Sequence, residues 1–448
     1  MTIIRNIFVL CGMLLVVFST SVAEIYASTT TTASCSVADV SAAITSASRG
    51  DTVLVPAGSC TWSSSLKITK GLKLQGAGIG STVITSSQSS MISYQPDATA
   101  ITNNERFEVS GFTLTSTITS GGSGAIFVTT PAAALPISNV VIHHNRLVTG
   151  TTTPLGQKAI HIVGTIYGVA YLNEFHGQYA LDALNQLGYQ DWLNYPAQAG
   201  TSKAFYLEDN LFEVTPFPYN ESGQGGSMYV FRYNTINLGA AAENGDMWDM
   251  HGDQGAGSGK GLEAYGNNFT NCSIPNRVTV QRGGTGRVFF NKSNCSSSNW
   301  VAEWHQCGPE QVMNTYYWNN YYGGALVRAN EDTTNNTGCL TENVHYWNHN
   351  LSYNGSSQRG IFVGSALPAV CTSGDGAWIT TQTVGGSMTG MVGQNPTTPI
   401  TGTLYRCGSG NSWASYYTPY TYPHPLRTGT GGGSDATPPA PPTGVRIL

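Results

Sequence analysis

Residues 42–84, AAITSASRGDTVLVPAGSCTWSSSLKITKGLKLQGAGIGSTVI, decide the fold class of this chain. A helix is expected over residues 36–48, because apolar residues recur at helical spacing after a serine cap and Arg49-Gly50-Asp51 ends the pattern. Short runs rich in β-branched residues follow, each cut by Gly, Ser or Lys-Gly turns. These runs are residues 52–56, 66–68, 72–74 and 83–84. One helix followed by a series of short strands predicts an all-β protein.

This segment resembles the N-terminal cap helix and first coils of the pectate-lyase-like right-handed parallel β-helix superfamily. The resemblance implies a single-domain, right-handed parallel β-helix with an N-terminal cap helix, which we expect to span residues 28–427. Enzymes of this superfamily mostly cleave acidic polysaccharides, so the resemblance also implies that class of substrate. Residues 428–448 are rich in Gly and Pro and have the composition of a linker or tail.

An internal repeat supports the same fold. Apolar or aromatic residues, an Asn and a further apolar residue recur along the chain, and the closest of these Asn are 23 and 24 residues apart. Asn tolerates the left-handed backbone of a sharp bend and can hydrogen-bond to the Asn of the next coil, so we assign these residues a structural role. They are Asn145, Asn173, Asn210, Asn234, Asn268, Asn291, Asn319 and Asn348.

The N-terminal sequence predicts export. Residues 1–27 contain an early Arg5, an apolar run over residues 7–18 and small residues before a cleavage site, which is typical of a secretory signal peptide. The apolar run is shorter than the roughly 20 residues that span a bilayer, so no membrane association is expected. Eight of the nine cysteines lie beyond this segment, an even number that suits an oxidising compartment. Sequential pairing is the simplest hypothesis, and Cys35 and Cys60 are expected to bond because they flank the predicted helix and first strand.

Composition excludes some classes of function. Charged residues make up 10% of the chain, against roughly 25% in typical domains. The net charge is −5, which offers no basic surface for nucleic acid. The sequence does not determine the oligomeric state.

Residues 246–282 and their flanks concentrate the candidate chemical groups. Within the twenty-one residues 243–263 the chain places four acids, a histidine, a lysine and a further glutamate, although it has few charges elsewhere. The candidate metal ligands are Glu243, Asp246, Asp249 and Asp253, since Ca²⁺ prefers several oxygen ligands. If the backbone is extended there, Asp249, His251 and Asp253 share one face, and His251 is a candidate catalytic residue.

The order of these groups resembles that in the chondroitinase B and alginate lyase family, in which an acidic cluster precedes a Lys and an Arg follows about one coil later. On that resemblance Lys260 matches the catalytic Lys and Arg282 the Arg. The chain departs from the family in lacking its Asn-Lys-Ser run and its paired Glu. The resemblance implies a secreted polysaccharide lyase that uses Lys260 and Arg282 as base and acid, with Ca²⁺ as the one expected cofactor.

Two alternatives stay open. A glycoside hydrolase of the same fold needs two carboxyl groups roughly 5–10 Å apart, which Asp246, Asp249 and Asp253 can supply. A non-catalytic, adhesive protein would bind glycan through aromatic side chains. Substrate binding is expected at an insertion and at a smaller second cluster of polar residues. These candidate binding residues are Tyr189 and Trp192 in the insertion, and Glu303 and His305 in the cluster. The aromatic, Pro-interrupted residues 416–427 are expected to lie along the last coils.

Overall fold

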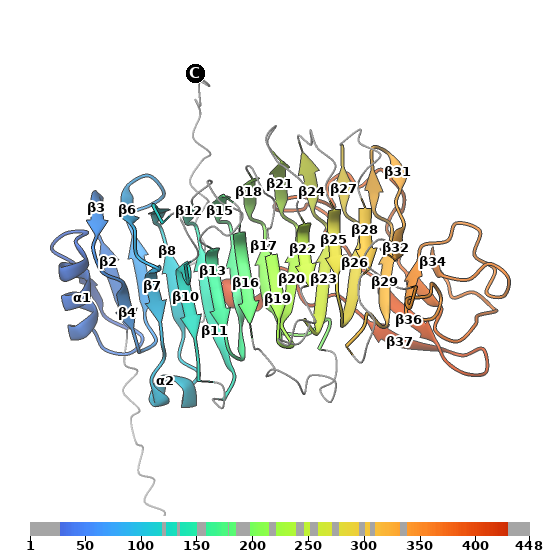
Figure 1. Cartoon of the computed structure of the whole chain (residues 1–448), viewed down its shortest axis with the longest axis horizontal. Coiled ribbons are helices and arrows are strands. Elements are labelled where there is room, and N and C mark those ends of the chain that lie inside the picture. The colour runs from blue at the N-terminus through green and yellow to red at the C-terminus, as the bar shows by residue number, and fades with distance from the viewer. Residues whose placement is uncertain are drawn as a thin grey trace, which may run out of the picture.

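The computed structural model describes residues 27–118, 122–131, 135–149, 158–177, 179–184, 198–214, 221–238, 246–250, 259–270, 277–294, 301–304, 310–331 and 338–428. The protein is an all-β chain with three long, mostly parallel sheets, and the strands of each sheet follow one another along the long axis of the molecule (Figure 1). We name them sheets A, B and C. From β2 to β30 the strands enter sheets A, B and C in turn, so each coil of the chain contributes one strand to each sheet. This arrangement is compatible with the parallel β-helix expected from the sequence.

The strands of each sheet are short, and their bounds are as follows. Sheet A contains β1 (Thr29–Thr31), β2 (Thr52–Val55), β5 (Lys73–Gly76), β8 (Phe107–Ser110), β11 (Ile137–His143), β14 (Ile166–Tyr171), β17 (Phe205–Glu208), β20 (Met228–Arg232), β23 (Gly261–Tyr265), β26 (Thr285–Phe289), β29 (Thr315–Trp318) and β33 (Tyr346–Asn348). Sheet B contains β3 (Gly58–Trp62), β6 (Thr82–Ser86), β9 (Thr113–Ser116), β12 (Arg146–Val148), β15 (Glu174–His176), β18 (Leu211–Val214), β21 (Thr235–Leu238), β24 (Asn268–Thr270), β27 (Lys292–Ser293), β30 (Tyr321–Tyr322) and β31 (Ala325–Leu326). Sheet C contains β4 (Leu66–Ile68), β7 (Ser90–Tyr94), β10 (Gly124–Thr129), β13 (Lys158–Val163), β16 (Tyr179–Leu184), β19 (Glu221–Gln224), β22 (Asp246–Met250), β25 (Arg277–Gln281), β28 (Val301–Trp304) and β32 (Ala329–Glu331).

The predicted cap helix is present as α1 (Val37–Ser46), at the left end in Figure 1. Ser36 caps it by accepting a hydrogen bond from the Asp39 N–H, as the serine cap in the sequence predicts. Its apolar face covers the open end of the first coil. The predicted Cys35–Cys60 disulfide is confirmed and ties the helix to β3. A second short helix, α2 (Ala98–Thr102), has no counterpart among the predicted elements.

The interior between the three sheets is a continuous apolar core, because alternate residues of every strand point inward. One inward row of sheet A crosses eight consecutive strands, and all eight of its side chains are buried. That row is Val109, Ile142, Ala170, Leu207, Phe231, Ala264, Val288 and Tyr317.

The Asn repeat forms a buried ladder between sheets A and B, as expected. From Asn173 onward, each Asn side-chain oxygen accepts hydrogen bonds from both the backbone N–H and the side-chain amide of the ladder Asn on the preceding coil, at 2.9–3.1 Å. The ladder residues are Asn145, Asn173, Asn210, Asn234, Asn267, Asn291 and Asn320.

The ladder corrects three residues and one conformation of the prediction. Asn348 lies outside it, since its side chain hydrogen-bonds to the backbone of Ala329. Asn267 and Asn320 belong to it rather than their neighbours Asn268 and Asn319. The left-handed residue at each bend is the one before the ladder Asn, for example Tyr233 with φ 56°. The ladder Asn therefore stabilises the bend through its side chain, and another residue adopts the strained backbone.

The C-terminal residues build a fourth sheet outside the coils and then cover sheet A. This sheet contains β34 (Ile361–Gly364), β35 (Gly376–Ile379), β36 (Thr403–Cys407) and β37 (Trp413–Tyr417), at the right end in Figure 1. A Cys371–Cys407 disulfide joins β36 to the loop before β35, which matches sequential pairing.

Residues 418–428, which include the 3-10 helix η2 (Pro425–Arg427), form a C-terminal strap on the outer face of sheet A. The rings of Tyr422 and His424 pack on Tyr233 and Tyr206, and the Arg427 guanidinium lies over the ring of Tyr171. The expectation that residues 416–427 lie along the last coils holds for Tyr416, whose ring packs on that of Tyr316. It is wrong for the strap, which reaches the middle coils, where buried charges bind it. Among the described residues, no helix is long and apolar enough to cross a membrane.

Candidate functional site

The outer face of sheet C carries a row of polar residues in register across adjacent strands. His161 on β13 pairs with Asp182 on β16, which pairs with Ser222 on β19 and then with Asp249 on β22. The row continues through Val280 and then Glu303 on β28. The flanking residues on these strands, such as Ile160 and Trp248, lie in the apolar core, so alternation directs the row away from it. We call this set the sheet C row.

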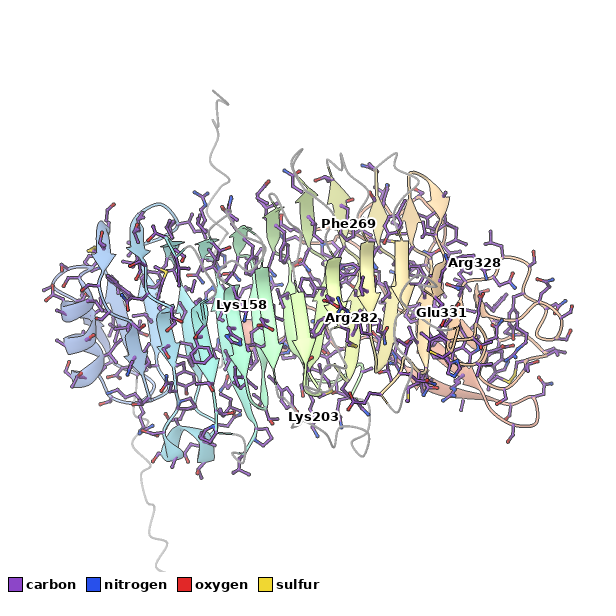
Figure 2. All side chains as sticks on the ribbon, viewed as in Figure 1. Lys158, Lys203, Phe269, Arg282, Arg328 and Glu331 are labelled. Atoms are coloured by element: carbon purple, nitrogen blue, oxygen red, sulfur yellow. A yellow bond between two sulfur atoms is a disulfide. The ribbon has the colours of Figure 1, made fainter. Side chains whose placement is uncertain are left out.

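Asp249 is held by an arginine from the next coil. The Arg282 Nη2 donates to Asp249 Oδ2 at 3.2 Å, and Nε lies 3.2 Å from Oδ1. The carboxylate is buried, whereas the side chain of Arg282 is 25% exposed. Arg282 therefore presents a positive charge at the surface beside a carboxylate that fixes its position (Figure 2).

Lys260 lies at the same corner as Arg282, where the chain passes from sheet C to sheet A. The backbone N–H of Arg282 donates to the carbonyl of Met250 at 3.0 Å, and that of Thr285 donates to the carbonyl of Lys260 at 3.0 Å. The two residues are therefore on adjacent coils. They are not directly opposite, because Gly261 pairs with Thr285 and Arg282 comes three residues before that partner. Lys260 is buried, and burial lowers the pKa of its ammonium group.

A second cluster of titratable side chains lies at the other end of the sheet C row. Lys158 Nζ lies 2.5 Å from Asp182 Oδ2, and His161 Nε2 lies 3.7 Å from the same oxygen. The Nδ1 of His161 is 3.0 Å from the carbonyl oxygen of Ser123, so Nδ1 carries the proton that this contact needs. The ring of Phe127 packs at 5.2 Å from that of His161. Burial lowers the pKa of His161, which favours the neutral imidazole.

Two polar atoms of this group have no hydrogen-bond partner among the described residues. They are Nε2 of His161 and Oδ1 of Asp182, both on buried side chains. Neither residue was singled out from the sequence, because one polar residue in an apolar strand is usually structural. The signal lies in the register, which places both on the same outward row as Asp249.

Carboxylate-bearing residues occur at every second coil along the row. Asp182, Asp249 and Glu303 are each separated by one intervening strand. Two strand spacings amount to roughly 9.6 Å between successive members. The register therefore places acidic residues at regular intervals along the sheet C row, with Asp182 and Asp249 buried.

Several predicted site residues lie outside the described residues. These are Tyr189, Trp192, Glu243, His251, Asp253 and His305. Asp246 and Glu303 are described only as backbone positions on β22 and β28. Glu263, which lies close to these residues in sequence, lies elsewhere in space: it is on the outer face of sheet A, where the Tyr417 hydroxyl donates to it at 2.5 Å.

The described residues give no support for the expected calcium site. They contain no group of three His, Cys, Asp or Glu side chains able to hold a metal ion. The carboxylate of Asp249, one of the expected ligands, is engaged by Arg282. A cationic partner on a candidate ligand opposes cation binding at that carboxylate.

Comparison with known proteins identifies no family. No protein-family model matches the chain, and no curated protein matches it. Among solved structures, a chain described as ORF18 of Geobacillus virus E2 is 13% identical over 85% of this chain and 72% of that chain, with a TM-score of 0.29. A TM-score this low carries no argument about fold or function. The function is therefore argued from the residues of this chain.

Proposed function

We propose that the protein is an exported right-handed parallel β-helix enzyme that cleaves an acidic, uronate-containing polysaccharide by β-elimination. The observation that carries the proposal is the corner between sheets C and A, where Lys260 and Arg282 lie on adjacent coils. One of these cations has a lowered pKa and the other is partly exposed. A base and a fixed positive charge are the two groups that β-elimination from a uronate requires.

The chemistry assigns a role to each group. Neutral Lys260 accepts the proton from the carbon next to the uronate carboxylate, and Arg282 stabilises the negative charge that develops on that carboxylate. The electron pair of the broken C–H bond forms the new carbon–carbon double bond as the glycosidic C–O bond breaks. The leaving oxygen takes a proton from water, and the proton accepted by Lys260 returns to the resulting hydroxide. Because burial already disfavours the ammonium form of Lys260, less free energy is needed to deprotonate it near neutral pH.

The role of Arg282 depends on Asp249. A guanidinium held through two contacts keeps its orientation, which reduces the entropy lost when a substrate carboxylate binds. The sheet C row then supplies further positions along the polymer, with Asp182 two coils and His161 three coils from Asp249. Long parallel sheets provide a face on which several sugar units can bind in line.

A hydrolase is the second candidate, and the spacing of the row favours it. Inverting glycosidases separate their two carboxyl groups by roughly 6.5–9.5 Å, close to the roughly 9.6 Å between acidic positions on every second coil. In that mechanism Asp249 and one of its neighbours in the row, Asp182 or Glu303, act as base and acid. The hydrolase leaves saturated ends, whereas the lyase creates a double bond.

The test is to incubate the protein with pectate, alginate, chondroitin and neutral glycans. Ultraviolet absorbance of unsaturated ends and the release of reducing ends should both be measured. Both signals support the lyase, and reducing ends without absorbance support the hydrolase. Binding with neither signal overturns both enzymatic proposals and leaves the glycan-binding alternative.

The matched variants are Lys260→Ala and Lys203→Ala, since Lys203 is an exposed lysine outside the site. Lys260→Ala should lower cleavage about 10²–10⁴-fold, the usual contribution of a general base, and Lys203→Ala should leave it unchanged. Cleavage by the parent should rise with pH through a pKa below the ordinary lysine range. Full activity of Lys260→Ala, with unsaturated products, would show that the base is elsewhere.

A further inference from the structure

A second candidate site lies on sheet B, away from the sheet C row. A cavity of about 410 Å³ opens on the outer face of this sheet, near the end of the molecule opposite α1. Its walls come from β27, β30, the turn after β30 and one glycine of the C-terminal region. They are Lys292, Ser293, Asn294, Tyr321, Gly323, Gly324 and Gly386. This volume falls within the roughly 300–1,000 Å³ of small-molecule sites.

Local backbone structure builds the cavity. Lys292 and Tyr321 are directly paired on β27 and β30, so their side chains emerge side by side on the outer face. β30 then turns back into β31 through Gly323 and Gly324, whose positive φ angles of 56° and 81° form a tight hairpin. With no side chains on these two glycines, the rim of the cavity stays open.

Beside the two strands and the glycine turn, the remaining wall of the cavity comes from residues that are distant in sequence. The backbone N–H of Gly385 donates to Asn319 Oδ1 at 3.1 Å, which fixes this segment beside the coil that contains Tyr321. A Cβ at Gly386 would lie 3.3 Å from the Tyr321 ring, so the glycine lets the main chain approach one part of that ring closely. Tyr321 is thereby held in place and is only partly buried.

The charge of the cavity comes from one cation. Lys292 is partly exposed and has no acidic side chain within ion-pair distance in the part of the chain that the structure describes. Its neighbours in the same row of sheet B are Asn268 and Tyr321, both neutral. Asn294, exposed at the rim, adds an amide donor and acceptor. A cation beside an aromatic ring and an amide matches a ligand that has an apolar face, a negative charge and hydroxyl groups.

We propose that this cavity binds one acidic sugar unit of the polysaccharide without cleaving it. The sugar ring lies against Tyr321, its carboxylate contacts Lys292 and its hydroxyl groups bond to Asn294. The choice of an acidic sugar rests on the proposed function, but binding here requires none of the residues on sheet C. Such a site would hold the enzyme on its polymer while the sheet C face acts on another segment.

The experiment measures binding of a short uronate oligosaccharide by calorimetry in the Lys260→Ala background, where cleavage does not deplete the ligand. Lys292→Gln removes the charge and should weaken binding at this site roughly tenfold or more, as expected for the loss of a charge-assisted hydrogen bond. Lys203→Gln is the matched control and should bind as its parent does. A neutral oligosaccharide of equal length should show no dependence on Lys292.

A second pair of variants tests the location of the binding site without changing Lys292. Gly324→Asp adds a negative charge at the rim, and Gly410→Asp adds the same charge at a hairpin on the small sheet. Both glycines have positive φ and no atom within 4 Å of an added Cβ, so the two changes should be equally tolerated. Gly324→Asp should weaken binding and Gly410→Asp should not.

Unchanged binding in both Lys292→Gln and Gly324→Asp would overturn the site. Measuring cleavage by Lys292→Gln in an otherwise unaltered protein separates the proposed binding cavity from the proposed lyase site. Loss of the binding event with cleavage intact supports the cavity as a separate site. Binding at the cavity in a protein that cleaves none of the polymers would overturn the lyase and leave this site standing.

Discussion

The outer faces of sheets A and C both carry charged residues, but on sheet A the C-terminal strap supplies charged and polar partners to the cluster around Glu208. On sheet A, Arg232 and Glu208 are completely buried and lie 2.6 Å apart. The same guanidinium donates to the Tyr265 hydroxyl and to the carbonyls of Tyr420 and Thr421 in the strap region. Arg427 from the strap also binds Glu208 and Asp209. On sheet C, by contrast, Arg282 remains 25% exposed.

The difference lies in what covers each face. The C-terminal strap supplies partners for Glu208, Asp209 and Arg232, so we assign these three charges a structural role. Burial alone would raise the pKa of Glu208, but Arg232 and Arg427 keep it below the ordinary value. On sheet C, His161 and Asp182 leave polar atoms without partners among the described residues. Arg287 on sheet A also has guanidinium nitrogens without hydrogen-bond partners, but its guanidinium lies over the rings of Tyr416 and Tyr417, whereas the paired charges around Glu208 are held by the strap.

The largest expected effect is on stability, from Glu208→Gln on sheet A. The change leaves Arg232 buried without its anion and leaves Arg427 with Asp209 alone, and breaking such a buried pair typically costs about 3–5 kcal/mol. The free energy of unfolding from denaturant titration measures it. Cleavage per folded molecule should be unchanged. A cost below about 1 kcal/mol would mean that the charges of sheet A are not structural and would break the comparison.

The second largest expected effect is a loss of folding stability in acid, in which the strap takes part through His424. Burial lowers the pKa of His424 to about 4 and that of His349 to about 4. A histidine with a lowered folded pKa binds its proton more readily in the unfolded chain, so its contribution is present above pH ~6.5 and lost as pH falls towards 4. Complete loss of this contribution lowers the free energy of unfolding by on the order of 3 kcal/mol for each of the two histidines.

His424→Asn isolates the contribution of the strap. An asparagine oxygen can still accept the Leu426 N–H that His424 Nδ1 accepts now. The variant should therefore lose less stability than the parent between pH 7 and 4, measured as the shift in denaturant midpoint. Equal losses in both proteins would contradict the assignment to His424.

A smaller effect is expected from Tyr417→Phe, which removes one hydrogen bond to Glu263 on sheet A. Burial raises the pKa of this carboxyl, and the Tyr417 hydroxyl and the Gly200 N–H oppose that rise. Loss of the hydroxyl should cost about 1–3 kcal/mol, because a buried acceptor loses a partner. Tyr405→Phe on the same small sheet is the control, since its hydroxyl makes no hydrogen bond to the described residues. Equal effects of the two changes would contradict this role.

Local signals in the sequence predicted local structure. The Ser36 cap, the helical spacing after it and the flanking Cys35 and Cys60 all act within a few turns of chain, and the structure confirms them. The Asn ladder was predicted but misplaced by one residue at Asn267-Asn268 and at Asn319-Asn320. At a tandem pair either Asn satisfies the local preference, and only the hydrogen bonds between coils decide which one enters the ladder.

Contacts between residues far apart in the chain could not be predicted from the sequence. The strap binds Asp209 through Arg427, 218 residues away, and no local pattern indicates which coil it reaches. His161 and Asp182 were missed for a related reason. The ladder Asn of successive coils are separated by 24 to 37 residues, so the outward row cannot be aligned without the register. For the same reason Lys260 and Arg282 could be assigned to adjacent coils but not to opposite positions.

The smallest expected effect on stability is that of Asp182→Asn, the sheet C counterpart of Glu208→Gln. Its partner Lys158 has a side chain that is 26% exposed, so the ammonium group can turn to water when the carboxylate is neutralised. Pairs with one solvated partner contribute about 1 kcal/mol or less, and we expect the free energy of unfolding to change by no more than that. The change should act on the substrate instead. If Asp182 only binds the polymer, KM rises several-fold with kcat nearly constant, and if it is one of two hydrolytic carboxyl groups, kcat falls by orders of magnitude. A stability loss as large as that of Glu208→Gln, with unchanged kinetics, would place Asp182 among the structural charges and remove it from the site.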